Sequence, residues 1–309
     1  MPDLFEHTAK TKRKSKLYSA KDIEVLEGLE PVRRRPGMYI GSTDERGLHH
    51  LVAELLDNAM DEAVAGEATH IDLELNKDGS VTVRDNGRGI PTDPHPRFKS
   101  KSALEVILTT LHSGGKFGGK AYETSGGLHG VGLSVVNALS DHLIVEVARD
   151  KAVWRQSYLR GNPTGKLKNI GKVSNRRGTS VTFHPDPNIF DLKARFRPST
   201  LYRMARSKAY LFRGVYIRWN CDTELISKND STPEKATLHF PGGLMDYLAT
   251  MLENRVTITP NAFFGQAKLN GGSGSIEWAV GWPKDEDFLF NSFCNTVPTP
   301  WGGTHEAGL

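Results

Sequence analysis

Apolar residues recur at helical spacing over residues 47–66, the most regular stretch of the chain. The pattern consists of Leu48, Leu51, Val52, Leu55, Leu56, Ala59, Met60, Ala63 and Val64. Residues three and four positions apart share one face of an α-helix. The spacing therefore predicts a helix over 47–66 whose apolar face lies in a core.

Alternating apolar and polar residues predict strands after this helix. The runs 71–75 and 81–83 alternate, and the segment between them contains Asp78-Gly79, a dipeptide typical of tight hairpin turns. We expect the two runs to pair as an antiparallel hairpin. Further strand-like runs lie at 142–149, 152–159 and 179–183.

Two more helices are predicted on either side of a glycine-rich segment. Ser102 and Glu105 have the spacing of a capping box, which opens a helix that reaches about residue 112. A second helical pattern covers 131–139. With the strands, these helices predict an α+β unit over 18–190, in which helices cover one face of a mostly antiparallel sheet.

The pattern changes after residue 190, where we place a domain boundary. A basic helical stretch to residue 210, a strand near 215–219, a helix after 241–243 and hairpin-like strands over 256–297 follow. We predict a second, α/β domain over 191–309. The tract 270–275 fits a natural hairpin loop and an engineered replacement equally well. The chain stops at Leu309 without a recognisable end, so we expect this domain to be truncated at its C-terminal side.

Composition supports two globular domains and excludes several classes. The 309 residues suffice for two domains, and 38% apolar with 25% charged residues is typical of globular proteins. No apolar run approaches the ~18 residues of a membrane-spanning helix. Two cysteines cannot make a disulfide framework, and the N-terminus lacks a secretion signal, so we expect a cytoplasmic location.

The net charge of +4 is concentrated at the N-terminus. Residues 1–17 contain a run of lysines and one arginine, and we expect this basic tail to be disordered. The same run could contact nucleic acid phosphates. The tail alone does not decide between these interpretations.

Acidic residues line the face of the first helix opposite its apolar face. They are Glu54, Asp57, Asp61 and Glu62, with Asn58 among them. Like charges at this spacing repel each other, and no lysine or arginine lies between them. A solvated helix face is one interpretation; a Mg²⁺ site is the other, because this ion prefers oxygen ligands and keeps several waters.

Two glycine-containing segments could bind a nucleotide. In the turn 84–91, Asp85 is followed by Gly87 and Gly89, so a flat ring could approach the backbone while the carboxylate accepts from an exocyclic amine. The glycine-rich segment 113–132 leads into a helix, whose N-terminal N–H groups can bind phosphate. An ordinary turn and a flexible linker are the respective alternatives, and neither the P-loop nor the dinucleotide pattern is present.

Taken together, these segments resemble the Bergerat-type ATP-binding fold shared by type II topoisomerase ATPase subunits, Hsp90, MutL and sensor histidine kinases. Proteins with this fold share four sequence motifs, called boxes. In this chain the segments that resemble them are, in order, Glu54-x-x-Asp57-Asn58-x-x-Asp61-Glu62, Asp85-x-Gly87-x-Gly89-Ile90-Pro91, Gly127-Leu-His-Gly-Val-Gly132 and Gly178-Thr179. The resemblance is greatest to bacterial type IIA topoisomerases and also includes 31–39 and Gly302-Gly-Thr-His305. Segments 94–96, 207–214 and 295–300 resemble the topoisomerase IV branch more than the gyrase branch.

The resemblance implies a role for each candidate residue. Glu54 would be the general base for the attacking water, Asn58 would hold Mg²⁺, and Asp85 would accept from adenine with Thr179 supporting it through water. Arg88 would pair with Glu62. Ile90 and Pro91 would form the floor of the nucleotide pocket beside Gly89, and Arg149 would lie at the pocket entrance. A closing lid would wrap the phosphates through Gly127, Leu128, His129, Gly130, Val131, Gly132 and Leu133, with Lys116 and Tyr122 in the same loop.

The resemblance also implies partners. They would be DNA, the DNA-cleaving A-type partner in a heterotetramer, and a second copy of the chain that dimerises on ATP binding, with Tyr18 reaching the other copy's nucleotide; pocket-directed inhibitors are also possible. Residues after 190 would form a transducer domain. Relatives carry a lysine loop some tens of residues after Gly302-Gly-Thr-His305, so hydrolysis without that loop should be slow.

Other functions remain as alternatives. A chaperone or mismatch-repair ATPase and a histidine kinase share the fold, and a non-enzymatic DNA-binding module could use the basic tail with the basic stretch after 190. That stretch contains Arg195, Arg197, Arg203, Arg206, Lys208, Arg213 and Arg218. A solvated helix face explains it equally well.

Overall fold

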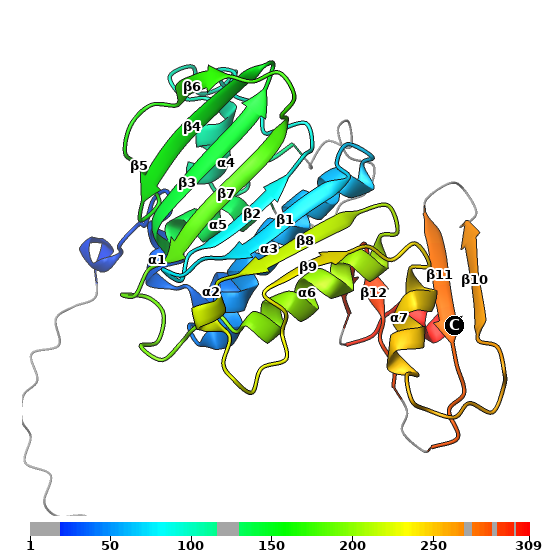
Figure 1. Ribbon diagram of the computed structural model, residues 1–309. Coiled ribbons are helices and arrows are strands. Elements are labelled where there is room, and N and C mark those ends of the chain that lie inside the picture. Colours follow the sequence, from blue (N-terminus) through cyan, green and yellow to red (C-terminus); the bar gives the residue numbers. More distant parts are fainter. Residues whose placement is uncertain (1–18, 116–129, 269–273, 286–288, 300) are drawn as a thin grey trace, which may run out of the picture.

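A large mixed β-sheet forms the centre of the molecule, as seen in a computed structural model (Figure 1). The structure describes residues 19–115, 130–268, 274–285, 289–299 and 301–309. The sheet has nine strands in the order β5-β4-β3-β7-β2-β1-β8-β9, with β6 paired to β4. The strands are β1 (His70–Leu75), β2 (Val81–Asp85), β3 (Ser140–Arg149), β4 (Ala152–Leu159), β5 (Asn162–Pro163), β6 (Lys168–Lys172), β7 (Gly178–Pro185), β8 (Tyr216–Cys221) and β9 (Lys235–Leu238).

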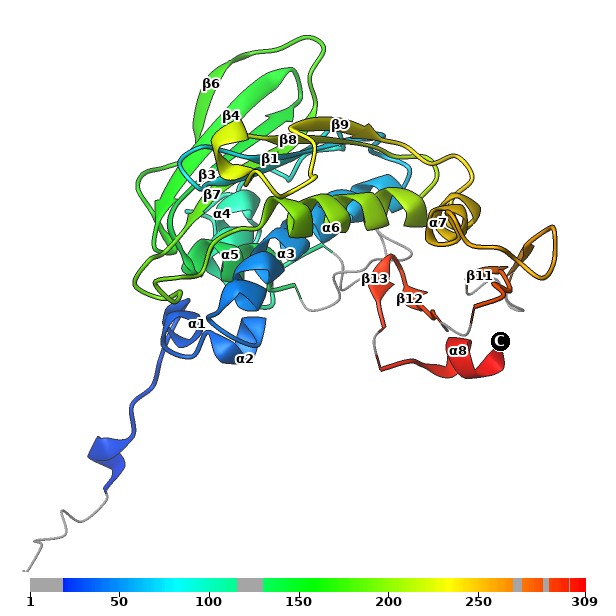
Figure 2. The ribbon, with the colours of Figure 1, turned by 60° about the horizontal axis from the view of Figure 1, so that its bottom comes forward.

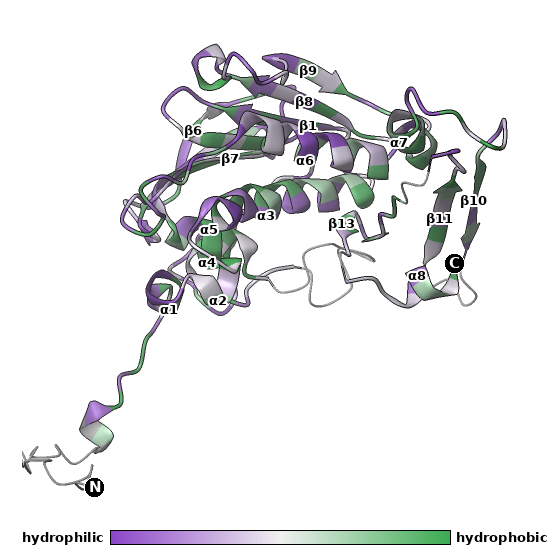
Figure 3. Cartoon of the chain, turned by 90° about the horizontal axis from the view of Figure 1, so that it is seen from below, coloured by the Kyte–Doolittle hydropathy of each residue, from purple (hydrophilic) through white to green (hydrophobic). Residues whose placement is uncertain are grey.

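The main helices form a layer against one face of this sheet (Figure 2). They are α3 (Glu45–Val64), α4 (Ala103–Thr109), α5 (Gly132–Ala138) and α6 (Pro198–Leu211), with the short helices α1 (Glu30–Arg34) and α2 (Gly37–Ile40) at one end. Helices α3 and α6 carry both hydrophobic and hydrophilic residues (Figure 3). Their apolar residues join the inward residues of the strands in one core that includes Leu51, Leu56, Phe183 and Trp219.

The segments after β9 form a smaller unit beside the sheet (Figure 2). It contains α7 (Leu244–Met251), the hairpin β10 (Phe263–Lys268) and β11 (Ser275–Val280), the short pair β12 (Phe293–Cys294) and β13 (Val297–Pro298), and α8 (Thr304–Gly308). Helix α7 packs on β11 and on α6. This unit therefore contacts the main helix layer through α6.

The predicted α+β architecture and its main elements are present. The long helix begins at Glu45, where the Asp44 carboxylate accepts from the N–H groups of Arg46 and Gly47. The hairpin pairs Leu73 with Val83 in antiparallel register. Ser102 Oγ accepts from Glu105 N at 3.1 Å and caps α4.

One strand pairing crosses the predicted domain boundary. Strand β8 pairs in parallel with β1, matching Leu73 with Trp219, and β9 then pairs with β8. Residues 198–238 therefore belong to the same sheet and core as the segment before residue 190. The division at 190 and the limits 18–190 and 191–309 remain predictions.

The N-terminal segment extends away from the body (Figures 1 and 2). Its 3-10 helix η1 (Ala20–Asp22) is joined to α1 by an extended stretch in which Ile23 and Val25 are exposed. Arg34 donates to Glu24 at 2.8 Å and ties the stretch to α1. None of the helices in the described ranges combines the length and the hydropathy that crossing a membrane requires.

Candidate active site

The acidic face of α3 meets cations from other parts of the fold. Lys208 Nζ lies 2.5 Å from Asp57 Oδ1, and Arg88 Nη2 lies 2.7 Å from Glu62 Oε1. His50 Nε2, one helical turn before Glu54, lies 3.2 Å from its Oε1. No lysine or arginine lies within the stripe itself, but in the folded chain cations reach it mainly from distant segments. Mutual repulsion therefore gives no argument for a metal ion.

Glu54 lies against the start of α5. A Cβ atom built on Gly132, the first residue of α5, would be 2.1 Å from Glu54 Oε2. Only glycine leaves room for the carboxylate at this distance. The amide of Asn58 donates to Glu54 O at 3.0 Å, so the two residues occupy the same turn of α3. Contact with Glu54 raises the pKa of His50.

Asp85 ends β2 at the start of a tight turn. Its Oδ1 accepts from Gly87 N at 2.8 Å and lies 3.4 Å from Thr179 N. A Cβ on Gly87 would lie 2.7 Å from Glu62 Oε2, so the turn requires glycine there. Burial raises the pKa of Asp85 to about 6, although the two N–H groups lower it. The carboxylate is therefore poorly solvated and held by the backbone.

The loop after Asp85 is held by ion pairs and by β7. Arg88 donates through its backbone N and through Nε to Glu62 Oε2, at 2.9 and 3.2 Å. Arg149 Nη1 donates to Gly89 O at 2.9 Å. The Thr179 hydroxyl accepts from Ile90 N at 3.2 Å. These contacts bring Glu62, Arg88, Gly89, Ile90, Arg149 and Thr179 around Asp85.

Close backbone packing explains the Gly178-Thr179 pair. Gly178 has φ of +113°, and a Cβ there would lie 2.0 Å from Asp85 O. The missing side chain lets β7 approach β2 closely enough for Thr179 N to reach the Asp85 carboxylate. The water-mediated role of Thr179 stays a prediction, whereas this backbone contact is direct.

Other candidate residues lie at the edges of this region or outside the described residues. Ile90, Val131 and Leu133 are partly buried against the core, whereas Pro91 is exposed. Gly130 O accepts from Ser113 N at 3.2 Å, next to α5. Tyr18, Lys116, Tyr122, Gly127, Leu128 and His129, with the tail 1–17, lie outside the described residues. Their roles remain predictions.

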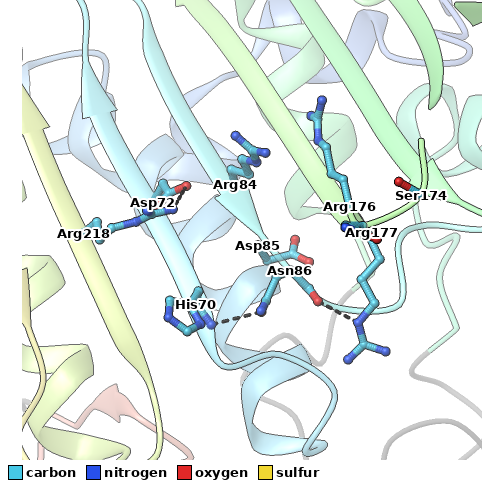
Figure 4. A pocket seen from close by; sticks show the side chains of 10 residues that line it. His70, Asp72, Arg84, Asp85, Asn86, Ser174, Arg176, Arg177 and Arg218 are labelled. Carbon is cyan, nitrogen blue, oxygen red and sulfur yellow. Dashed lines mark hydrogen bonds and ion pairs between the residues drawn. The ribbon is translucent and has the colours of Figure 1, made fainter. Parts of the chain in front are cut away.

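A depression of about 660 Å³ borders the Asp85 turn (Figure 4). Its lining includes Asp85 and the arginines Arg84, Arg176, Arg177 and Arg218. Arg218 forms a two-pronged ion pair with Asp72, at 2.6 and 3.0 Å, and Arg177 donates to Asn86 O at 3.0 Å. Glu54, Asn58 and Glu62 do not line it, so this depression is separate from the region between α3 and α5.

Possible metal ligands of two different chemistries are present, although among the histidines, cysteines and acidic residues of the described ranges only Asp141, His142 and His184 bring three ligand atoms close together. Near Glu54, the donors are the carboxylate and amide oxygens of α3, which suit a hard ion such as Mg²⁺. On β3 and β7, Asp141 Oδ1 lies 2.7 Å from His142 Nδ1 and 3.0 Å from His184 Nδ1. Imidazole is a ligand for transition metals rather than for Mg²⁺. The oxygen set on α3 therefore fits the expected ion.

The basic stretch after residue 190 does not form one free cationic face. Several members pair with carboxylates: Arg197 with Glu45, Lys208 with Asp57, Arg213 with Glu277 and Arg218 with Asp72. Arg206 packs over the ring of Tyr210. Paired charges contribute less to binding phosphate.

Sequence reasoning missed two partners of the acidic face. His50 precedes Glu54 by four residues, so helical spacing alone signals that pair. Lys208 carries no comparable signal, because it is far from Asp57 in the sequence and meets it only through packing of α6 on α3.

Comparisons with known proteins define the class to which this site belongs. Residues 43–189 match the family described as "Histidine kinase-, DNA gyrase B-, and HSP90-like ATPase", and residues 243–309 match "DNA gyrase B". The first match contains the described candidate residues from Glu54 to Thr179. The fold and site therefore define an ATPase-type domain of this class.

Individual relatives narrow the class further. The chain is 58% identical to the B subunit of DNA topoisomerase 4 from Caulobacter vibrioides, in an alignment that covers 94% of the present chain. It is 54% identical to the same subunit from Rickettsia felis, in an alignment that covers 100% of the present chain. It is 47% identical to the B subunit of DNA gyrase from Synechocystis over 94% of its length, which is 26% of that relative. This chain belongs to the family of type IIA topoisomerase B subunits, and it is more similar to these topoisomerase IV relatives than to that gyrase.

A solved structure supports the same assignment. The 43K ATPase domain of Thermus thermophilus gyrase B, in complex with an aminocoumarin, matches with a TM-score of 0.71 and 38% identity, covering 87% of this chain and 66% of that one. The chain spans less than half the length of the topoisomerase relatives, 42% of the Caulobacter protein and 47% of the Rickettsia protein.

Proposed function

We propose that this chain binds and hydrolyses ATP as the nucleotide-dependent part of a type II DNA topoisomerase of the topoisomerase IV branch. The observation that carries the proposal is the approach of Glu54 to Gly132. It brings a carboxylate to the first residue of α5, where helix N–H groups can bind phosphate oxygens. A base beside the phosphate group is the arrangement that hydrolysis by water requires.

Each described residue then has a chemical role. Glu54 orients and deprotonates the attacking water, and its neighbour His50 holds the carboxylate in place. Asp85 accepts from the adenine amine, because its backbone contacts fix the carboxylate at the end of β2. The Arg88–Glu62 pair and Arg149 hold the loop that carries Gly89, Ile90 and Pro91.

The divalent ion belongs to the proposal as well. Asn58 would hold Mg²⁺, since its amide lies in the same turn as Glu54 and its oxygen suits a hard ion. When bound, Mg²⁺ neutralises charge on the phosphates. The residues 130–133, with the lid residues that precede them, would enclose the triphosphate.

The partners form the wider part of the proposal. ATP binding would dimerise two copies, with Tyr18 of one reaching the nucleotide of the other, and the dimer would work with DNA and the DNA-cleaving A-type partner in decatenation and relaxation. The similarity to topoisomerase IV relatives supports this over negative supercoiling by a gyrase. We also propose a cytoplasmic location.

Calorimetric titration with a non-hydrolysable ATP analogue and Mg²⁺ tests the proposal. We expect saturable binding to the native chain and an affinity lower by about tenfold to a hundredfold in Asp85→Asn. A chain that binds DNA but no nucleotide would instead support the non-enzymatic DNA-binding module. The carboxylate partners of the basic stretch speak against that alternative.

A further inference from the structure

Lys208 joins three parts of the fold that are distant in the sequence. It lies on α6 and is only 5% exposed, whereas no other lysine within the described residues is buried. Its Nζ lies 2.5 Å from Asp57 Oδ1 on α3 and donates to Thr296 O at 2.7 Å. Burying an ammonium is costly unless it is paired and hydrogen-bonded, so both contacts matter to the charge.

The contact on α3 falls in the turn that carries the proposed chemistry. Asp57 precedes Asn58 directly and follows Glu54 by three residues, and the Asn58 amide donates to Glu54 O. A shift of Asp57 therefore moves the backbone from which both side chains project. Glu54 itself lies against Gly132 with no space to spare, so a small rotation of this turn changes its position.

The contact on Thr296 falls at the tip of the β12–β13 hairpin. Cys294 pairs with Val297, leaving Asn295 and Thr296 as the two residues of the loop, with φ of 48° and 67°. Positive φ is unfavourable for a β-branched residue such as threonine. The carbonyl that Lys208 holds thus belongs to a strained turn, whose conformation depends on outside contacts.

We propose that Lys208 is a positioning residue that couples the nucleotide site on α3 to the β12–β13 hairpin of the C-terminal unit. This inference rests on the proposed function. When nucleotide orders the Glu54 turn, Asp57 holds the ammonium, and the ammonium holds Thr296 O. When the turn is loose, the hairpin tip loses a fixed donor. Coupling of this kind needs a physical link between the two sites, which this pair of contacts supplies.

Hydrogen exchange measured with and without a non-hydrolysable ATP analogue and Mg²⁺ tests the coupling. In the native chain, we expect the analogue to slow exchange at the backbone amides of 293–297 and 299 by about fivefold or more. In Lys208→Met, we expect the analogue to bind with an affinity within about threefold of native, with no response of the hairpin and turnover lowered by about fivefold or more. Lys208→Arg, which keeps the charge, should restore part of the response.

Two further variants separate coupling from mere stability. Lys235→Met removes an exposed lysine from β9 and should behave as the native chain does. Asp57→Asn combined with Lys208→Met leaves no unpaired charge, so it should fold even where Lys208→Met does not. If Lys208 had a purely structural role, the double variant should again show slower exchange of the hairpin amides when the analogue binds. That result would overturn the proposal. If the native chain bound no analogue, the proposed function would fail as well; binding with a hairpin response unchanged in Lys208→Met would overturn the coupling alone.

Discussion

The half-buried carboxylate of Asp85 is expected to lower the stability of the fold while it serves nucleotide binding. Its pKa rises from 3.8 to about 6 through burial, whereas an unfolded chain returns it to its ordinary value. One pKa unit corresponds to about 1.36 kcal/mol, so the shift amounts to a cost of up to about 3 kcal/mol for holding the ionised group in the fold. The N–H contacts from Gly87 and Thr179 are already included in this value.

Replacing Asp85 by asparagine should therefore stabilise the chain without nucleotide. Asparagine keeps an oxygen that accepts from Gly87 N, removes the charge, and removes the repulsion from Glu62. We expect a gain of about 1–3 kcal/mol at pH 7.5, the lower figure allowing for weaker hydrogen bonds to a neutral oxygen. Affinity for adenine nucleotides should fall by about tenfold to a hundredfold, because an amide cannot replace the fixed carboxylate acceptor.

The pH dependence of stability shows in which pH range the ionised Asp85 destabilises the fold. Because the pKa of Asp85 is raised in the fold, the native state binds a proton more readily than the unfolded state between pH 3.8 and about 6. The cost is absent below this window, grows as pH rises through it and is complete above about pH 6. Urea unfolding of both proteins at pH 4 and pH 7.5 should show the advantage of Asp85→Asn at the higher pH only. An equal advantage at both pH values, or destabilisation at pH 7.5, would refute the reasoning.

Three further predictions concern the base, its neighbour and the ion. Glu54→Ala should keep nucleotide affinity and abolish turnover, since binding and the attack of water depend on different residues; calorimetry with a phosphate-release assay checks this, and a parallel loss of both would contradict it. Gly132→Ala should lower turnover by about a hundredfold, because its Cβ would displace Glu54. Gly165→Ala, with no atom within 4 Å of its Cβ and outside the site, should leave turnover unchanged. Chelating Mg²⁺ should stop phosphate release, and continued turnover in excess chelator would exclude an ion held by Asn58.

Local patterns were sufficient to predict most of the elements. The helix predicted over 47–66 occupies Glu45–Val64, and the two strand runs pair as an antiparallel hairpin, as predicted. Both depend on contacts within a few residues, so periodicity and turn chemistry reveal them. The tight turn after Asp85 could also be predicted from its glycines. The structure explains why Gly87 is needed there, because a Cβ at this position has no room in the turn.

The charge environment of the site could not be predicted in the same way. The acidic stripe of α3 reads as unbalanced, yet Lys208 approaches it from α6. The Arg88–Glu62 pair was expected from the family resemblance alone, and not from the spacing of charges. Such partners depend on how helices and loops pack rather than on their spacing along the chain. Repulsion within a stripe is therefore a weak guide to a metal site until the fold is known.

The sequence by itself determined the helix–strand pattern, the glycine positions and the family resemblance, because these depend on neighbouring residues and on residue types in order. Only the tertiary structure decided that β8 pairs with β1 and that Lys208 lies between Asp57 and Thr296. Both are contacts between segments more than eighty residues apart. The strand pairing depends on the path of the whole chain. The lysine contacts form because that path buries the Lys208 ammonium, which then needs charged and polar partners.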